Sequence, residues 1–407
     1  MDSKNNNSVL NQLIDLYTQK IYSGLPEWNY AGADKNTEVQ RQKDTFVAKV
    51  NELKALLQKH GVQDEKIALR AMDLVIAKHV PDEHIQIRIA GEDKRAADLS
   101  NYPELKYKIP PNEKHNLIVS DEQFNKSELF TLTAPSAPDQ IANILVAEKQ
   151  IGNNAVGIVA IDSFVIEYAN EKVYEQVDKI ADYVLENSAH WNDIVFDFRG
   201  NGGGDASIIK QIGERLSGKK LEYADKIEII NPKLMEQTGA PERYEQKLND
   251  KTFSGNIYVL QDGGNSSAAD GAIWMLRQMD NCTTVGENTY GAFAGGDVKE
   301  HQMEGGTLFM GNTYRERTMP DGRKVEEGKG IPPDIICKSK DAYQRVINLI
   351  TEKSKTKQIS GEQQRIDELK SNIRRVNGVV SNGDEKVKFK QSDIKQNKVL
   401  VKVSQMM

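Results

Sequence analysis

The segment at residues 191–204 constrains the fold of this chain more than any other stretch of its sequence. An apolar run at 194–198, typical of a buried strand, contains Asp197, and it is followed by Arg199 and by glycines clustered around Asn201. A helical pattern begins a few residues later. Glycines let backbone N–H groups approach a bound group closely, and the N–H groups that open a helix carry partial positive charge. The segment predicts a strand, a glycine loop suited to an oxyanion, and a helix, although a tight turn explains it equally well by itself.

A second junction of this kind lies further along the chain. Residues 257–260 are typical of a buried strand, a glycine pair ends it, and two serines precede a helical pattern that begins at Ala268. A serine hydroxyl at the start of a helix lies where nucleophilic attack creates negative charge that nearby amides stabilise. Either Ser266 or Ser267 is therefore a candidate nucleophile, with the common role of helix N-cap as the alternative.

Together the two junctions resemble the C-terminal-processing and tricorn-type serine peptidases. In that family a strand ending in D-x-R-x-N-x-G-G is followed by a strand, a loop and S-A-x-E, whose serine is the nucleophile. Here the first motif spans 197–204, and the second is Ser267-Ala-Ala-Asp270, with Asp in place of Glu, which leaves the support of this helix start open. Further segments resemble the opening strand, the G-x-x-T-x-G segment, a strand with its turn, and the closing E-G-x-G-x-x-P-D signature, in family order: 156–164, 285–291, 314–322 and 327–334.

One departure from the family bears on the catalytic base. Members that use a serine/lysine dyad carry Lys directly after T-x-G, where this chain has Ala292. The resemblance then implies the tricorn-like branch, in which a His acts as the base and a Glu orients it. In that branch the His follows a helix and an Asp and precedes a strand, as His84 does here after Asp82 and before the alternating run 85–89. Glu327, in the closing signature, matches the acid.

The resemblance therefore implies Ser267 as the nucleophile, His84 as the general base and Glu327 as the orienting acid. A serine hydroxyl needs a base to take its proton, His has a suitable pKa near neutrality, and a carboxylate behind the ring fixes its tautomer. The oxyanion donors are expected among three backbone amides: those of Ala268, Gly202 and Gly203.

Each role has a rival. Ser266 is the alternative nucleophile, His301 the alternative base, and Glu326 and Glu287 the alternative acids. The other histidines have ordinary explanations at helix ends, on helix surfaces or in polar connections: His60, His79, His115 and His190.

The composition agrees with a peptidase that acts on peptides or unfolded proteins. The chain has 407 residues, enough for two or three domains, and a net charge of −6, which argues against nucleic acid as a partner. Its two cysteines are expected to be reduced, and no metal-binding or cofactor motif occurs. An oligomer is possible.

No apolar run is long enough to cross a bilayer, so no membrane span is expected. The first residues lack a basic and then apolar leader, which favours a cytoplasmic location unless such a leader has been removed.

The fold implied by the resemblance is α/β, with a crotonase/ClpP-like spiral of ββα units in the core. Four parts are expected: a helical N-terminal domain at 1–95, a connecting segment without a PDZ domain at 96–150, the serine peptidase core at 151–355, and a C-terminal helix with a basic tail at 356–407. Within these parts the patterns predict N-terminal helices at 8–23, 38–60 and 63–79, parallel strands at 156–161, 193–198 and 256–260, helices at 172–186, 341–354 and 366–376, strands at 116–120 and 129–132, and a turn at Asn377-Gly378.

Two other functions share such a core. One is a binding protein that keeps the fold and has lost catalysis. The other is a crotonase-type enzyme acting on a coenzyme A thioester, which leaves Ser267-Ala-Ala-Asp270 and the closing signature unexplained.

Overall fold

The computed structural model describes residues 6–20, 35–79, 84–92, 95–97, 124–134, 137–164, 171–229, 252–292, 295–320, 322–323, 325 and 330–380. Several predicted features lie outside the described residues: Asp82, the strand at 116–120, His115, Glu326, Glu327 and the basic tail after 380. The chain divides into two compact units, Met1–Ile350 and Thr351–Met407, and each is considered by itself.

A mixed seven-stranded sheet forms the centre of the first unit. Its strands, in the order β11-β8-β7-β5-β4-β3-β2, are β2 (Lys126–Ala134), β3 (Ala137–Ile151), β4 (Asn154–Ile161), β5 (Asp193–Asp197), β7 (Asn256–Gln261), β8 (Cys282–Gly286) and β11 (Ile335–Ile336). From β4 to β11 neighbouring strands are parallel, whereas β2, β3 and β4 pair antiparallel. The predicted α/β class and the three predicted parallel strands are confirmed.

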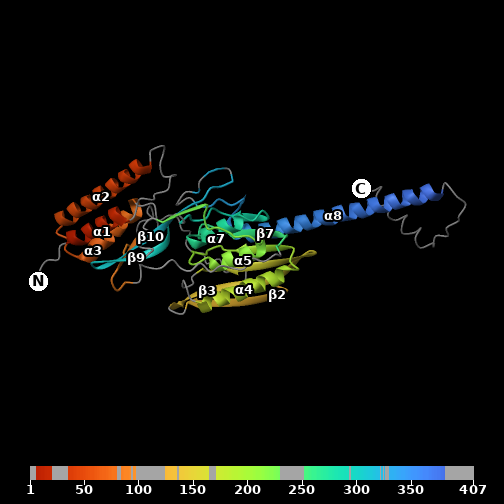
Figure 1. Cartoon of the computed structure of the whole chain (residues 1–407), viewed down its shortest axis with the longest axis horizontal. Coiled ribbons are helices and arrows are strands. Elements are labelled where there is room, and N and C mark those ends of the chain that lie inside the picture. The colour runs from red at the N-terminus through yellow and green to blue at the C-terminus, as the bar shows by residue number, and fades with distance from the viewer. Residues whose placement is uncertain are drawn as a thin grey trace. The chain divides into compact units, whose positions relative to one another are not determined.

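Both faces of this sheet are covered, which explains why its central strands are apolar throughout instead of alternating. Helices α4 (Glu171–Ser188), α5 (Ser207–Ser217) and α7 (Ala268–Arg277) cover one face, with α4 beside α5 (Figure 1). Val159 and Phe196 point toward that face, while Ile158 and Val195 contribute to a second core. The first residues of α8 (Ser339–Val380), up to Ile350, close this second core.

Two parts of the chain differ from the sequence predictions. The hairpin β2–β3 lies in the predicted connecting segment 96–150 and extends the sheet by two strands; the predicted strand at 129–132 falls within β2. The predicted turn at Asn377-Gly378 is wrong, because both residues lie within α8, which also joins the two helices predicted at 341–354 and 366–376.

The predicted N-terminal helices are confirmed, and they pack on a second, four-stranded sheet. The helices are α1 (Asn6–Lys20), α2 (Lys35–Lys59) and α3 (Glu65–His79), and the strands are β1 (Gln86–Ile89), β6 (Lys226–Ile229), β9 (Gly295–Met303) and β10 (Gly306–Glu316). Strand β10 pairs antiparallel with β1, β6 and β9. Figure 1 shows α1, α2 and α3 gathered beside β9 and β10. Residues from the first and last thirds of the sequence therefore share one core.

Among the described helices, none combines the length and the apolar character needed to span a bilayer.

Asp73 anchors the chain where α3 leads into β1. This side chain is fully buried, and its carboxylate accepts the Ile87 N–H over 3.0 Å, the Ala97 N–H over 2.9 Å and the Arg95 Nε–H over 2.8 Å. Burial raises the pKa of Asp73, and the Arg95 guanidinium opposes that effect. The carboxylate thereby fixes the start of β1 against α3.

Replacing Asp73 by Ala should destabilise the protein by about 3 kcal/mol, because it leaves two buried N–H groups and a guanidinium without their acceptor. The free energy of unfolding in urea measures this. Asp44→Ala, at an exposed position on α2, is the control and should change stability by less than about 0.5 kcal/mol. Equal stability of the two variants would refute the anchoring role.

Candidate active site

The two predicted strand–loop–helix junctions meet at one edge of the seven-stranded sheet. Strands β5 and β7 are parallel neighbours, so their carboxyl ends lie side by side, and the Phe198 N–H donates to the Leu260 carbonyl over 3.2 Å. Asn265, in the loop after β7, donates from Nδ2 to the carbonyl oxygens of Phe198 and Asn201. Direct hydrogen bonds therefore join the loop that follows β7 to the loop that follows β5.

Asp197 and Arg199, the charged pair of the first motif, have a structural role. Arg199 donates to Asp197 through Nε over 2.9 Å and Nη2 over 2.7 Å, and its Nη1 donates to the Ser339 carbonyl over 2.7 Å. Both charged side chains are buried, so this two-point geometry offsets the cost of removing them from water. The pair ties the end of β5 to the start of α8.

The glycine loop lies against the serine loop. Asn201 donates from Nδ2 to the Ile161 carbonyl over 3.1 Å, and its Oδ1 accepts the Gly203 N–H over 2.9 Å. Gly203 has φ +105°, and a Cβ there would lie 2.9 Å from the Ser267 Cβ and 3.0 Å from the Ala268 nitrogen. Only a glycine fits at this contact, which explains one glycine of the motif.

Ser267 occupies the N-cap position of α7 without acting as a side-chain cap. Its φ is +55° and its ψ −118°, and it is the one non-glycine residue with positive φ in the described part of the chain. Such a conformation costs on the order of 1–3 kcal/mol and persists only where its surroundings impose it. The neighbouring Ser266 donates its hydroxyl to the Gly202 carbonyl over 2.8 Å, so the two serines have different environments.

His84 reaches Ser267 from the other end of the sequence. Its Nε2 lies 3.0 Å from Ser267 Oγ, although 183 positions separate the two residues. The His84 side chain is half-buried. The residue lies two positions before β1, whose place is set by pairing with β10 and by Asp73. The imidazole and the hydroxyl are therefore within hydrogen-bonding distance.

The alternative histidines that the structure describes have other surroundings. His301 is buried on β9, opposite Leu308 of β10. His190 Nε2 lies 2.8 Å from Glu148 Oε2, and His60 is exposed beyond the end of α2. Of the side chain of His79, at the end of α3, nothing is described.

Three amides were predicted as oxyanion donors. The Ala268 amide opens α7 directly after Ser267, and in the described part of the chain no acceptor is found for it or for the Gly202 amide. The Gly203 amide, by contrast, donates to Asn201 Oδ1. In this conformation Ala268 and Gly202 are the donors that remain available.

The closing segment is described from Gly330 onward, and that part is firmly held. The Ile331 N–H donates to Thr289 Oγ1 over 2.7 Å, and the Thr289 N–H donates to the Ile331 carbonyl over 3.2 Å. A Cβ on Gly330, whose φ is +72°, would lie 1.9 Å from the Thr289 carbonyl oxygen. The two backbones thus touch directly.

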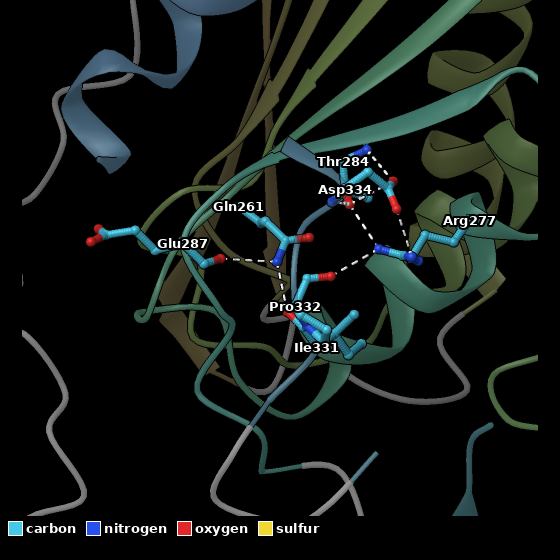
Figure 2. A network of polar contacts seen from close by, with 7 residues as sticks. All are labelled: Gln261, Arg277, Thr284, Glu287, Ile331, Pro332 and Asp334. Atoms are coloured by element: carbon cyan, nitrogen blue, oxygen red, sulfur yellow. Dashed lines mark hydrogen bonds and ion pairs between the residues drawn. The ribbon is translucent and has the colours of Figure 1, made fainter. Parts of the chain in front are cut away.

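A second group of hydrogen bonds ties the same segment to α7, β7 and β8 (Figure 2). Asp334 accepts the Thr284 N–H over 2.8 Å, the Thr284 hydroxyl over 2.9 Å and Arg277 Nη2 over 2.8 Å. Gln261 donates from Nε2 to the Ile331 carbonyl over 2.8 Å. Ile331, Pro332 and Asp334 of the closing segment are therefore fixed to α7, which begins next to the nucleophile candidate, and to the strands beside it.

Glu287, an alternative acid, is engaged elsewhere. Its Oε1 accepts Lys338 Nζ over 3.2 Å and its Oε2 accepts the Ser339 N–H over 3.2 Å. In Figure 2 its carboxylate points away from the Gln261 amide, to which Glu287 offers only its backbone carbonyl, over 2.9 Å.

A metal site is not found among the described residues: no three His, Cys, Asp or Glu side chains come together in a way that could hold an ion.

Comparisons with known proteins show which family and which solved structures the chain resembles. Residues 155–337 match the model of peptidase family S41. Among solved structures the chain is similar to mature CPAF, with a TM-score of 0.51, 13% identity, and coverage of 86% of this chain and 96% of that one. Mature CPAF complexed with lactacystin gives a TM-score of 0.50 and 12% identity over 87% of this chain and 98% of the other.

A peptidase described as putative, from Parabacteroides merdae, gives a TM-score of 0.48 and 14% identity over 86% of this chain and 96% of that chain. No curated protein matches the chain in sequence. The matched stretch contains both junctions and the closing segment, so the chain is a serine-type peptidase, a hydrolase, whose core matches the S41 family model.

Gly203→Ala should lower the rate of peptide hydrolysis by on the order of 100-fold, because the added methyl group displaces the Ser267 loop by a fraction of an ångström or more. Hydrolysis of a fluorescently labelled unfolded protein measures this. Gly200→Ala is a matched control: Gly200 also has positive φ, +75°, but its Cβ would meet nothing within 4 Å. Similar losses in the two variants would show that backbone strain, not the contact with Ser267, causes the effect.

Proposed function

We propose that this protein hydrolyses peptide bonds through an acyl-enzyme, with Ser267 as the nucleophile, His84 as the general base and Glu327 as the acid that orients His84. The observation that carries the proposal is the 3.0 Å approach of His84 Nε2 to Ser267 Oγ. This is the distance over which a base takes the proton of a hydroxyl.

The first chemical step follows from that contact. Ser267 Oγ attacks the carbonyl carbon of the scissile peptide while its proton passes to His84 Nε2. The imidazolium then gives this proton to the departing amine, and an ester of Ser267 remains. Water, deprotonated by the same imidazole, hydrolyses the ester and restores the serine.

The negative charge of each tetrahedral intermediate would be stabilised by backbone amides. Ala268 lies at the N-terminus of α7, where the helix dipole adds to its hydrogen bond, and Gly202 lies on the glycine loop, where its carbonyl accepts the Ser266 hydroxyl. The positive φ of Ser267 supports this arrangement. It would let the Ser267 hydroxyl attack the carbonyl carbon of the scissile peptide while the Ala268 amide donates to the oxygen of the same carbonyl.

Two observations favour an imidazole base over an amine. The position at which related peptidases carry a lysine is Ala292, which is buried, and His84 already approaches the hydroxyl. The assignment of Glu327 rests on its place in the closing signature and on the firm anchoring of the residues that follow it. These features support the tricorn-like branch of the family.

The substrates we propose are peptides or unfolded proteins, in keeping with the family. The fold also accommodates a catalytically silent binding protein as an alternative. The contact between an imidazole and a serine in a strained conformation favours the enzyme, because a binding function requires neither feature.

Labelling with a fluorophosphonate tests the nucleophile and the base. We expect one adduct, on Ser267, which is absent in Ser267→Ala and forms at least about 100-fold more slowly in His84→Ala. Mass spectrometry of tryptic peptides identifies the labelled residue. Ser266→Ala and His301→Gln are the matched controls, and both should label at nearly the normal rate. Absence of any adduct between about pH 5 and pH 9 would favour the silent binding protein.

Replacing Glu327 by Gln should lower kcat by roughly 10³- to 10⁴-fold and leave KM almost unchanged, because the imidazole loses the group that fixes its tautomer. Steady-state hydrolysis of an unfolded protein substrate measures both constants. Glu326→Gln, the neighbouring candidate, should behave like the unaltered enzyme. The reverse result would transfer the role of the acid to Glu326.

A further inference from the structure

Asp270 is a buried acid next to the site for which the proposed mechanism has no use. It lies three residues after Ser267 in the first turn of α7, so the two residues occupy the same face of the helix. Its side chain is 0% exposed, and neither carboxylate oxygen makes a hydrogen bond of acceptable geometry in the described part of the chain.

An acid in the first turn of a helix ordinarily accepts backbone N–H groups or interacts with the helix dipole at the surface. Asp270 does neither. The Thr289 hydroxyl and the Gly291 amide face its carboxylate closely enough to lower its pKa, yet neither reaches hydrogen-bonding geometry. A structural role as a helix cap therefore does not account for this residue.

The charged groups that act on Asp270 come from two other elements. Arg317, which directly follows β10, is fully buried, and a Cβ placed on Gly271 would lie 3.5 Å from its Nη2. The other group is His84. A fixed guanidinium and the ring that approaches Ser267 therefore both act electrostatically on the carboxylate.

Burial dominates the ionisation of this carboxyl. It raises the pKa of Asp270 from 3.8 to about 7, against the opposing effects of Thr289, Arg317, Gly291 and His84. Keeping the ionised form in the folded protein therefore costs free energy at and above neutral pH. A cost of this kind next to a catalytic group is typical of residues retained for function.

We propose that Asp270 is a positioning residue of the hydrolytic site, whose buried anion stabilises the imidazolium that His84 becomes when it takes the proton of Ser267. The inference rests on the proposed function. Arg317 is the fixed cation that acts on the Asp270 carboxylate before the reaction begins. When the proton moves from Ser267 Oγ to His84 Nε2, a positive charge appears near the Asp270 carboxylate and lowers the free energy of the tetrahedral intermediate. No proton needs to leave Asp270 in this step.

The first test is the pH dependence of kcat/KM in Asp270→Asn. We expect a loss of tenfold or more at about pH 8, where Asp270 is ionised, because each tenfold corresponds to about 1.4 kcal/mol of lost stabilisation. Below the pH optimum, Asp270 and the catalytic base must both be free of a proton for the unaltered enzyme to act. A plot of log kcat/KM against pH therefore rises with a slope approaching two. In Asp270→Asn the slope falls to one. A structural role would lower the rate equally at every pH.

The second test uses stability, for which the two roles predict opposite signs. An acid with a raised folded-state pKa stabilises the protein fully below its unfolded value of 3.8 and loses that contribution as the pH rises to about 7. Asp270→Asn removes the buried charge, so its Tm should exceed that of the unaltered protein by a few degrees near pH 8, with no difference near pH 4. Loss of a structural acid would instead lower the Tm.

Two variants serve as controls. Asp270→Glu keeps the charge and should retain the slope of two on the acid side. Asp193→Asn replaces a buried acid at the start of β5, whereas the glycine loop follows the end of that strand. This variant should leave the pH profile of kcat/KM unchanged.

The inference is overturned if Asp270→Asn keeps the rate and slope of the unaltered enzyme, or if it unfolds at a lower Tm near pH 8. Either result leaves the proposed function intact, provided that the fluorophosphonate still labels Ser267. Absence of labelling in the unaltered protein overturns the proposed function itself.

Discussion

The antiparallel pairing of β1 with β10 is the constraint on which the candidate active site of this peptidase depends. β1 begins two residues after His84, whereas β10 follows Ser267 by about forty positions, so this pairing brings two distant parts of the sequence to one place. Four residue pairs, from Gln86 with Phe309 to Ile89 with Gly306, fix the register. A slip by one residue would turn the apolar side chains of β1 away from the core formed with α1, α2 and α3, so the same burial that stabilises the N-terminal helices also determines where the imidazole lies.

Much of this arrangement could be predicted from the sequence, because its local signals are strong. Strands β5 and β7 are uninterrupted apolar runs followed by glycines, and the helices after them have a clear apolar face, so their order and their parallel pairing followed directly. His84 and Ser267 were found through motifs, and their 3.0 Å contact supports the roles given to them. The spacing of residues could not show that Gly203 donates its amide to Asn201, since that depends on the path of the loop.

The features that sequence analysis missed are those whose apolar pattern is weak or shared between distant segments. Only residues 129–132 of β2 were predicted, because this strand lies at the edge of the large sheet, where Leu129 stays exposed while Leu132 is buried, and the rest of its pattern resembles a polar connection. The second sheet takes strands from both ends of the sequence, and none of them predicts its partners by itself. In α8 charged residues follow one another with little apolar periodicity, and a turn motif at Asn377-Gly378 lies within its last turns, so one long helix looked like several short elements.

The deviations from ordinary folding rules gather around Ser267, and each requires support from elsewhere. Ser267 has a strained backbone, Gly203 lies in contact with it, and the buried Asp270 carboxylate has no hydrogen bond among the residues that the structure describes. Two ion pairs supply this support. Asp197 binds Arg199 at the end of β5, just before the glycine loop, and Asp334 binds Arg277 at the last residue of α7. Because α7 carries Ser267 and Asp270 at one end and Arg277 at the other, the network in Figure 2 holds the helix in place against the strain at its start. The strain thus lies where Ser267 and His84 meet, and the ion pairs hold the elements around it in place.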